Sequence, residues 1–495
     1  MRDTPKIAAS ETKQPEYHAI SSLNLRPYTT RWAKFLRGQC TDMTVGRILA
    51  LPLKHRSPTP RVFKRPPETR RIGIRRSTNA LLGLGHAKMH PSASELCIHI
   101  EVFRLYGNSF SGMSRVAFLL GSGISYASGA PTVTALTDSV LNGAWWQHTD
   151  LRFYPRPSSE EQISAGIARL AQEFLCRLSQ EITPHLQMRE NRSPNYEDIY
   201  AAARQLLDDE TGEILSPLIA ATLKKIKGNM VDLCAEVEPH IDGNAFASLT
   251  EKAIDLIQFV VFHGLAPVQK PVKLRILTDI TRHVEETNIF SLNHDLLLEA
   301  QANEANVRLV DGFGKRIHDV RIFNGDWSIN DDVARLIKLH GSINWNVIRS
   351  GAIDQFATIL GNSESARGID GKLINSTSIT PLFLTGTTVK ERAYGIGPFG
   401  ELFNAFRSLL SRHRTLVCSG YGWGDKGINI RLRQWLRDAK ENRIVLLDAR
   451  QEEEIAGTRM WWARWDMYKA AGKVVHIRKW LGDCTLEDLK PYFDP

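Results

Sequence analysis

The sequence predicts an α/β protein built on a doubly wound parallel sheet. Short apolar runs with the character of buried strands recur along the chain, and helical patterns lie between several of them. The first such run opens the stretch VAFLLGSGISYASGAPTVTALTDSVL, residues 116–141, where a glycine-rich turn leads into a helical pattern. Strands of a parallel sheet are buried on both faces, which accounts for apolar runs without alternation.

The composition fits a globular protein with a sizeable core. The chain has 495 residues, of which 42% are hydrophobic, enough for about two to four domains. It has no apolar run of roughly 18 residues and no signal-peptide pattern, so we expect a cytoplasmic protein without a membrane span. No C-x-x-C pair occurs among the six cysteines, so neither a disulfide framework nor a zinc ribbon is expected.

The net charge of +9 is concentrated at the N-terminus. Residues 1–112 hold 19 Lys/Arg and 7 Asp/Glu, whereas residues 113–495 hold 44 and 47. A basic segment can bind the phosphate backbone of nucleic acid, or it can be a solvated extension. Its weak periodicity favours the extension. Met113 stands three residues before the first strand, where a translation start would be natural.

The expected elements place a helical insertion after the first β-α unit. A helix is expected at about 132–141, and apolar residues recur at helical spacing through about 158–282. Strands are then expected in TNIFSL, RLIKLHG, PLFLTG, RTLVCSGY, RIVLLDA and KVVHIR, with helices in GELFNAFRSLLSRH and GINIRLRQWLRDAK.

The glycine-rich turn after the first strand is a candidate phosphate site. Glycines let the backbone approach an anion, and the free N–H groups at a helix start attract its charge. A tight structural turn explains the two glycines about as well, because the third glycine of the dinucleotide fingerprint is missing. The candidate residues are Gly121, Ser122, Gly123, Ile124 and Ser125.

Two polar motifs follow later strands directly. Asn293, His294 and Asp295 come after TNIFSL, and His340 ends the strand in RLIKLHG. Ligands bind at the carboxyl ends of strands in such sheets. Asp295 alone can equally be a helix N-cap, and a lone histidine is more often structural than catalytic.

Two further strand ends complete the set. The strand in TLVCSGYGWGD ends in a glycine-rich turn with Gly420 and Tyr421, and Asp448 ends the strand in IVLLDAR. Asp448 can accept hydrogen bonds from ribose hydroxyls, or it can be a solvated loop acid. Because all five positions follow predicted strands, we expect one edge of one sheet to collect them.

These motifs, in this order, resemble the sirtuin superfamily, and specifically the sirtuin-like NAD-cleaving effectors of bacterial antiphage defence. GSGISYASGAP is similar to the sirtuin loop G-A-G-I-S-x-x-S-G-I-P, with Ser122 for Ala and Ala130 for Ile. SLNHD resembles T-Q-N-I-D and matches Asn293 and Asp295 to its Asn and Asp, while KLHGSINW places His340 on the catalytic His. SGYGWGD is similar to a G-Y-S-F-G-D turn of defence-type members. The resemblance covers about residues 113–478 and implies a Rossmann-like domain.

Two departures from the deacylating sirtuins argue against protein deacylation. The two C-x-x-C pairs that hold structural zinc are missing, so no zinc is expected. Thr132-Val133-Thr134 stands where those enzymes have Asp-Phe-Arg. NYEDIY, residues 195–200, resembles an element of the NAD-cleaving relatives but can be an ordinary capped helix start, and we assign it no chemistry. The tryptophans of WW at 145–146 and of MWWARW at 460–465 are interpreted as packing residues.

The resemblance implies an NAD⁺ glycohydrolase that depletes NAD⁺ and uses NAD⁺ as its substrate. His340 would be the general base, since an ordinary histidine pKa near 6.5 suits neutral pH. Asn293 would orient the ribose and the attacking water, and Asp295 would bind the carboxamide of nicotinamide. The glycine loop would hold the pyrophosphate. The adenosine side would be lined by Gly420, Tyr421 and Asp448.

Other function classes stay open at this point. A catalytically silent sensor of NAD⁺ or ADP-ribose could gate a partner, a deacylase is less favoured, and a DNA-binding regulator would use the basic N-terminal arm. A free NAD⁺ hydrolase would drain its host, so the activity must be gated. We expect a homo-oligomer or a separate partner protein such as an ATPase to supply that gate.

Residues 1–112 are predicted to be dispensable for folding. They hold the surplus charge and little periodic hydrophobicity, so a chain that begins at Met113 is expected to be soluble and to keep any NAD⁺ cleavage. Circular dichroism, gel filtration and an activity assay on the two chains test this. Aggregation or loss of activity in the shorter chain alone would show that the segment is a genuine domain.

Overall fold

The structure is a computed structural model of the chain. It describes residues 114–494, apart from 158–165, 215, 238–243, 329–332, 351–352, 361–365, 375–379, 387–389, 459 and 462. The expected N-terminal extension, residues 1–112, lies outside the described residues, so its dispensability stays a prediction.

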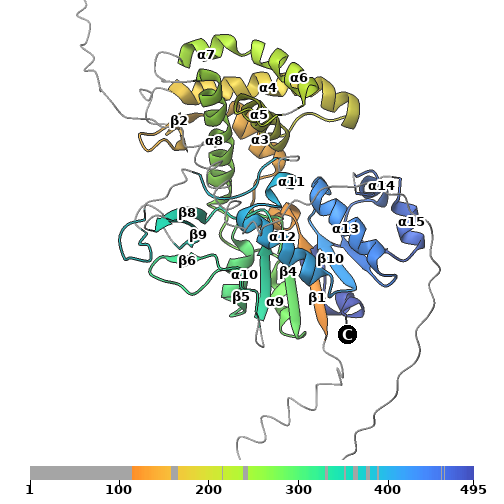
Figure 1. Cartoon of the computed structure of the whole chain (residues 1–495). Coiled ribbons are helices and arrows are strands. Elements are labelled where there is room, and N and C mark those ends of the chain that lie inside the picture. Colours follow the sequence, from red (N-terminus) through yellow and green to blue (C-terminus); the bar gives the residue numbers. More distant parts are fainter. Residues whose placement is uncertain are drawn as a thin grey trace, which may run out of the picture. The chain divides into compact units, whose positions relative to one another are not determined.

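A seven-stranded sheet forms the centre of the described region, and every neighbouring pair of its strands is parallel. The strand order is β12-β11-β10-β1-β4-β7-β5 (Figure 1). The chain builds β4, β5 and β7 on one side of β1 and then crosses over to build β10, β11 and β12 on the other side, which places the topological switch point beside β1. The strands are β1 Arg115–Leu120, β4 Glu286–Ser291, β5 Arg308–Val310, β7 Val333–Lys338, β10 Thr415–Ser419, β11 Arg443–Leu447 and β12 Val474–Ile477.

Helices cover both faces of the sheet, as the sequence predicts. Leu119 belongs to a core cluster with α12, Gly397–Leu410, and α13, Lys426–Asp438. Phe118, one residue earlier, packs in a different cluster on the other face. The helices of that second face are α9 Arg275–Thr281, α10 Leu297–Glu304 and α16 Leu486–Leu489. The chain thus has a doubly wound, Rossmann-like α/β fold.

A helical region follows β1 and its glycine turn and has a hydrophobic core of its own, which includes Leu136 and Val140 of α3, the helix expected to belong to the first β-α unit. Its long helices α4 and α8 pack on each other, and α5 packs on α8. The pattern at 215–237 forms two helices rather than one, because α6 ends at Gly228 and a turn separates it from α7. This region contains α3 Val133–Asn142, β2 Trp145–Gln147, β3 Phe153–Pro155, α4 Gly166–Glu190, α5 Tyr196–Glu210, α6 Pro217–Gly228, α7 Val231–Val237 and α8 Ala245–Leu265.

The segment PLFLTG, expected as a strand, is a loop that lies along the turn after β7. Its backbone makes isolated hydrogen bonds to that turn instead of a continuous strand ladder. Leu384 N–H donates to His340 O at 2.8 Å, and Leu382 O accepts from Ser342 N–H at 3.3 Å. A small antiparallel sheet in the order β6-β9-β8 was not expected from the sequence. Its strands are β6 Val320–Ile322, β8 Trp345–Ser350 and β9 Ile353–Ile359.

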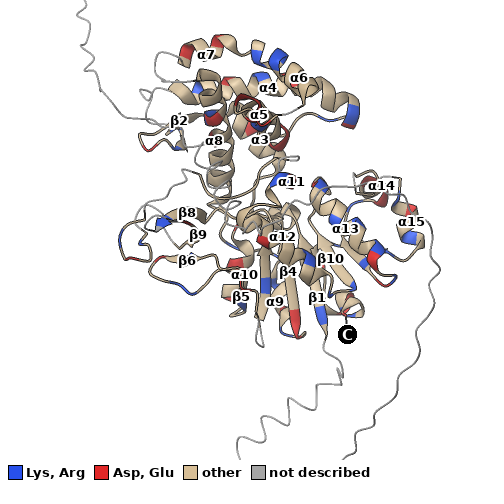
Figure 2. Ribbon diagram, viewed as in Figure 1, with Lys and Arg blue, Asp and Glu red and all other residues tan. Residues whose placement is uncertain are grey.

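The remaining elements follow the sheet. Trp461 and Trp465 are buried in the core beside α13, which confirms their interpretation as packing residues. Figure 2 shows charges of both signs spread over the helices, while the strands are mostly uncharged. None of the helices in the described part of the chain is long and apolar enough to cross a lipid bilayer. The short helices are α11 Lys390–Ala393, α14 Glu452–Ala456 and α15 Trp465–Ala470.

Candidate functional site

The carboxyl ends of β10, β1, β4 and β7 lie side by side, since these strands are neighbours in the sheet. The glycine turn follows β1, Asn293 follows β4, His340 follows β7 and Gly420 follows β10. The crevice beside a topological switch point is where ligands bind in open α/β sheets. The side chains below come together at this edge.

The glycine turns after β1 and β10 touch each other through their backbones. Gly123 N–H donates to Gly420 O at 2.9 Å, and Gly121 N–H donates to Ser419 O at 3.0 Å. A Cβ on Gly121 would lie 2.5 Å from Gly420 O. The two glycines of the first turn therefore serve a close backbone contact, and the Gly123 amide is engaged there rather than free for a phosphate.

Ser125 links the first turn to the polar motif after β4. This turn forms a 3-10 helix, Ser122–Ser128, that buries Ile124 and Ser125 and leaves Ser122 and Gly123 exposed. Ser125 Oγ donates to Asp295 Oδ2 at 2.7 Å and accepts from Asn293 Nδ2 at 3.0 Å. The glycine loop and the Asn-His-Asp motif thus form one hydrogen-bonded unit.

Two buried polar atoms in this unit have no partner among the described residues. They are Asn293 Oδ1 and His294 Nδ1. Asp295 Oδ1 accepts the Leu297 N–H at 3.1 Å at the start of α10, although the N-cap position of that helix is Leu296. A buried polar atom without a partner costs free energy of about 1–3 kcal/mol, so these two atoms are the natural contacts for a bound molecule.

His340 lies in a buried cluster with Tyr394 and Asp425. The imidazole Nε2 is 2.7 Å from the Tyr394 hydroxyl and 3.1 Å from Asp425 Oδ2. The Tyr394 hydroxyl donates to the same carboxylate oxygen at 2.6 Å. The three side chains are at most 7% exposed, so water does not screen their interaction.

Burial and charge set the ionisation of this cluster. Burial lowers the pKa of His340, and the nearby Lys390 ammonium lowers it further, while Asp425 opposes both. Burial raises the pKa of Asp425, but the hydrogen bond and charge of His340 outweigh this and hold it well below its usual range. Burial raises the pKa of Tyr394 well above its usual value. At neutral pH the cluster therefore consists of a neutral imidazole, a carboxylate and a phenol.

A buried ion pair lies beside the cluster and reaches the helical region. Lys390 Nζ is 3.1 Å from Glu197 Oε1, and Lys390 is 5% exposed. Glu197 belongs to NYEDIY, the motif to which the sequence analysis assigned no chemistry. Asn195 and Asp198 form the capping box that starts α5 there, so the capped-helix interpretation also holds.

Tyr421 and Asp448 lie at their strand ends but bond within their own turns. Tyr421 is buried, and its hydroxyl donates to Asp425 O and Asn429 Oδ1 at 3.1 Å and 3.0 Å. Asp448 is buried and accepts from Arg450, with 2.6 Å between Asp448 Oδ2 and Arg450 Nη2. Their predicted place on the adenosine side stays a prediction.

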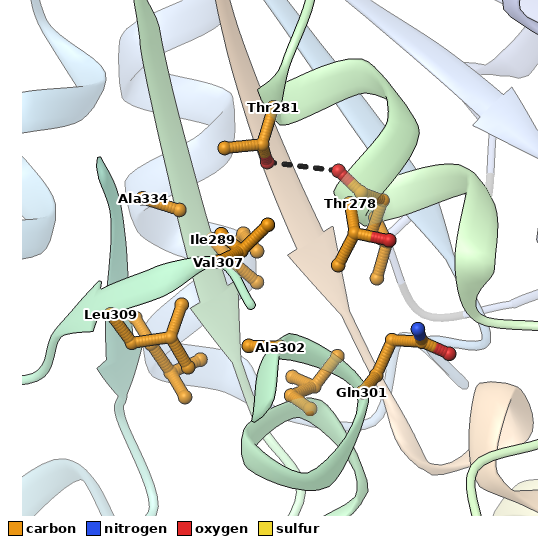
Figure 3. A pocket seen from close by; sticks show the side chains of 11 residues that line it. Thr278, Thr281, Ile289, Gln301, Ala302, Val307, Leu309 and Ala334 are labelled. Atoms are coloured by element: carbon orange, nitrogen blue, oxygen red, sulfur yellow. Dashed lines mark hydrogen bonds between the residues drawn. The ribbon is translucent and has the colours of Figure 1, made fainter. Parts of the chain in front are cut away.

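A small cavity among the described residues of the sheet domain lies away from these side chains. It is lined from α9, α10, β4, β5 and β7 and has a volume of about 10 Å³, room for about one water (Figure 3). An open groove of about 350 Å³ lies instead beside Tyr394, between α12 and α13. Among the described residues, no group of three or more His, Cys, Asp or Glu side chains is placed to hold a metal ion.

Four groups of this site were not among the predicted site residues: Glu197, Lys390, Tyr394 and Asp425. Asp425 ends the motif SGYGWGD, so its position after a strand was the available signal. Lys390 and Tyr394 follow no strand, and their segment carries no pattern that predicts contact with His340.

Comparison with known families confirms the resemblance to the sirtuin superfamily. The family model described as a SIR2-like domain matches residues 287–467. The match begins in β4, so it includes Asn293, His340 and Asp425 but neither the first glycine turn nor α3–α8. A comparison with curated proteins found no match.

Solved structures similar to the chain include two Sir2 homologues. A mutant homologue in complex with 2′-O-acetyl ADP ribose is 13% identical, with a TM-score of 0.27, over 75% of this chain and 88% of that one. A homologue in complex with NAD is 13% identical, with a TM-score of 0.27, over 75% of this chain and 86% of that one.

Substitution of Gly420 by Ala is predicted to destabilise the protein by about 1–3 kcal/mol, the usual cost of forcing an extra methyl group into packed atoms. Gly420 has a φ of +66°, and a Cβ there would lie 2.5 Å from Ile124 N. Urea denaturation of the full chain measures the change. Gly422→Ala is the matched control, because nothing lies within 4 Å of its Cβ position. Equal stability of the two variants would contradict the prediction.

Proposed function

Because residues 287–467 match a SIR2-like domain, we propose that the chain is an NAD⁺ glycohydrolase. It would hydrolyse the bond between nicotinamide and ribose, giving nicotinamide and ADP-ribose. The observation that carries the proposal is the meeting of Asn293, Asp295 and His340 with the first glycine turn at one edge of the sheet. These groups are what the resemblance implies for NAD⁺ cleavage.

The chemistry needs one base and one group that orients the nucleophile. When the bond between the pyridinium nitrogen and C1′ of the ribose breaks, its electron pair goes to nicotinamide, and oxocarbenium character develops at C1′. The oxygen of water then bonds to C1′ while its proton moves to the neutral imidazole of His340. Asn293 Oδ1, which is buried without a partner, supports a role in holding that water or a ribose hydroxyl.

The proposed roles of Asp295, the first glycine turn and Gly420 also rest on the contacts at this edge of the sheet. Both oxygens of Asp295 already accept a hydrogen bond, but a carboxylate has about four acceptor positions, so the nicotinamide carboxamide can still be bound. Ser122, which is exposed in the first glycine turn, would contact the pyrophosphate, while the Gly123 amide stays bonded to Gly420 O. Gly420 would act by shaping this turn.

Asn293→Ala and His340→Ala are each predicted to lower NAD⁺ turnover by about 10²–10⁴-fold, the usual contribution of a positioned base or comparable group. Release of free nicotinamide by the purified protein is the measurement, and circular dichroism checks that the variants are folded. Wild-type turnover in either folded variant would contradict the mechanism. Tight NAD⁺ binding without cleavage by the wild type would favour the sensor.

We further propose that the enzyme is a gated effector of antiphage defence. The site residues are nearly fully buried, so substrate access requires part of the structure to move. The segment with Tyr394 is tied to α5 by Lys390–Glu197 at 3.1 Å and by Arg392–Asp208 at 2.6 Å. A self-assembly contact or a partner such as an ATPase that shifts the helical region would therefore act on the site.

Arg392→Gln is predicted to raise the basal NAD⁺ turnover of the isolated chain about fivefold. The Arg392 side chain is 56% exposed, so its pair with Asp208 contributes about 1 kcal/mol or less to the closed state. Asp208 keeps Arg204 as a partner at 3.2 Å, which protects the fold. The measurement is turnover together with mass in solution over a range of protein concentrations.

The exposed Arg412→Gln serves as the matched control for loss of a positive charge and should leave turnover unchanged. A fully active isolated monomer, insensitive both to concentration and to Arg392→Gln, would overturn the gate.

A further inference from the structure

Asp425 has no role in the chemistry described so far, yet it faces His340 directly. Its Oδ2 lies 3.1 Å from His340 Nε2, and its Oδ1 accepts the Ile428 N–H at 2.9 Å as the N-cap of α13. Since one oxygen holds the start of the helix, the other is held in place against the imidazole. The two oxygens therefore have separate tasks.

The hydrogen bonds around His340 define its tautomer. Tyr394 has one hydroxyl hydrogen, and it donates this hydrogen to Asp425 Oδ2 at 2.6 Å. The Tyr394 oxygen and the carboxylate are then both acceptors at Nε2, 2.7 Å and 3.1 Å away. Only a hydrogen on Nε2 satisfies both, so the lone pair of the neutral imidazole is on Nδ1.

We propose that Asp425 is a positioning residue that holds His340 with its basic nitrogen at Nδ1 and stabilises the imidazolium after proton transfer. The inference rests on the proposed function, because it requires His340 to act as a base. The proton of the attacking water would move to Nδ1, and the resulting cation would be paired with Asp425. That proton later leaves to solvent, while Asp425 stays ionised throughout.

If Asp425 were only the N-cap of α13, its replacement by Asn would have a different effect on activity. Asn is as good an N-cap as Asp, so Asp425→Asn keeps the acceptor for Ile428 N–H and removes the charge. Its amide group, if turned toward His340, donates to Nε2 and drives the hydrogen to Nδ1. The base would then carry its lone pair on the wrong nitrogen. Activity falls under the proposal and persists under a capping role alone.

The pH dependence gives a second readout. Burial and Lys390 lower the pKa of His340, whereas Asp425 and Glu197 raise it. Removing the charge of Asp425 therefore lowers the pKa of His340, and the acid limb of the pH–rate profile moves to lower pH. The titratable groups that face His340 are Asp425, Tyr394, Lys390, Glu197 and His294.

The experiment compares full-length wild type with Asp425→Asn, Tyr394→Phe and Asp438→Asn. Asp438 is exposed at the far end of the same helix, so its variant is the matched control for the loss of a carboxylate. NAD⁺ turnover is measured from about pH 5 to 9, which spans the titration of histidine. The tautomer of His340 is read from ¹⁵N chemical shifts, with His340→Gln to assign the signal.

The expected result has three parts. Asp425→Asn lowers kcat by about 10²–10⁴-fold with an unchanged melting temperature, as is usual for the loss of a group that orients a catalytic histidine. The acid limb of the pH–rate profile of this variant moves to lower pH, and its ¹⁵N spectrum shows that His340 has lost the hydrogen on Nε2. Tyr394→Phe keeps the wild-type tautomer, and Asp438→Asn behaves as wild type.

The proposal is overturned if Asp425→Asn keeps the wild-type kcat and the wild-type tautomer of His340. It is also overturned if the variant loses activity only because its fold is less stable. A wild type that is inactive together with an inactive Arg392→Gln variant would contradict the NAD⁺ glycohydrolase function instead. In that case the ¹⁵N spectra still decide on Asp425, since a wild type without the Nε2 hydrogen would overturn its role independently of activity.

Discussion

The candidate site depends on the backbone contact between the glycine turns after β1 and β10. The Gly123 N–H to Gly420 O bond is 2.9 Å long, and a side chain on either residue would run into backbone atoms. Backbone atoms cannot yield as the end of a flexible side chain does. The contact therefore fixes the spacing of the two turns, one leading to Ser125 and the other to Asp425. Since Ser125 bonds Asn293 and Asp425 bonds His340, the contact joins the two turns that carry these supporting side chains.

A second constraint is the balance of charge around a buried histidine. Asp425 and Glu197 raise the pKa of His340, while the ammonium of Lys390, which is paired with Glu197, lowers it. Buried charges persist only when they are paired and hydrogen-bonded. Because Glu197 comes from α5 and Lys390 from α11, this pairing joins the helical region to the catalytic edge of the sheet. The same groups thus set the protonation of His340 and connect it to the part of the chain where a gate would act.

Local sequence patterns predicted the strands and helices in which several consecutive or regularly spaced residues are buried. The continuous apolar runs became β1, β4, β7, β10, β11 and β12, and helical spacing located α4, α5, α8, α12 and α13. The prediction failed at PLFLTG, where an apolar run forms single hydrogen bonds to the turn after β7 instead of a ladder. It also missed the β6-β9-β8 sheet, because strand formation depends on the packing context as much as on the local sequence.

The sequence by itself determined which residues follow the strands: Asn293, His340 and the glycine turns. A parallel sheet brings the ends of its strands to one edge, so their convergence follows from strand order alone. Only the tertiary structure decided what surrounds them. Tyr394 contacts His340 from a segment without a strand, and Lys390 of the same segment pairs with Glu197, which comes from a helix in a distant part of the chain. Such contacts depend on the path of loops and on the docking of a separate helical core, which no local periodicity encodes.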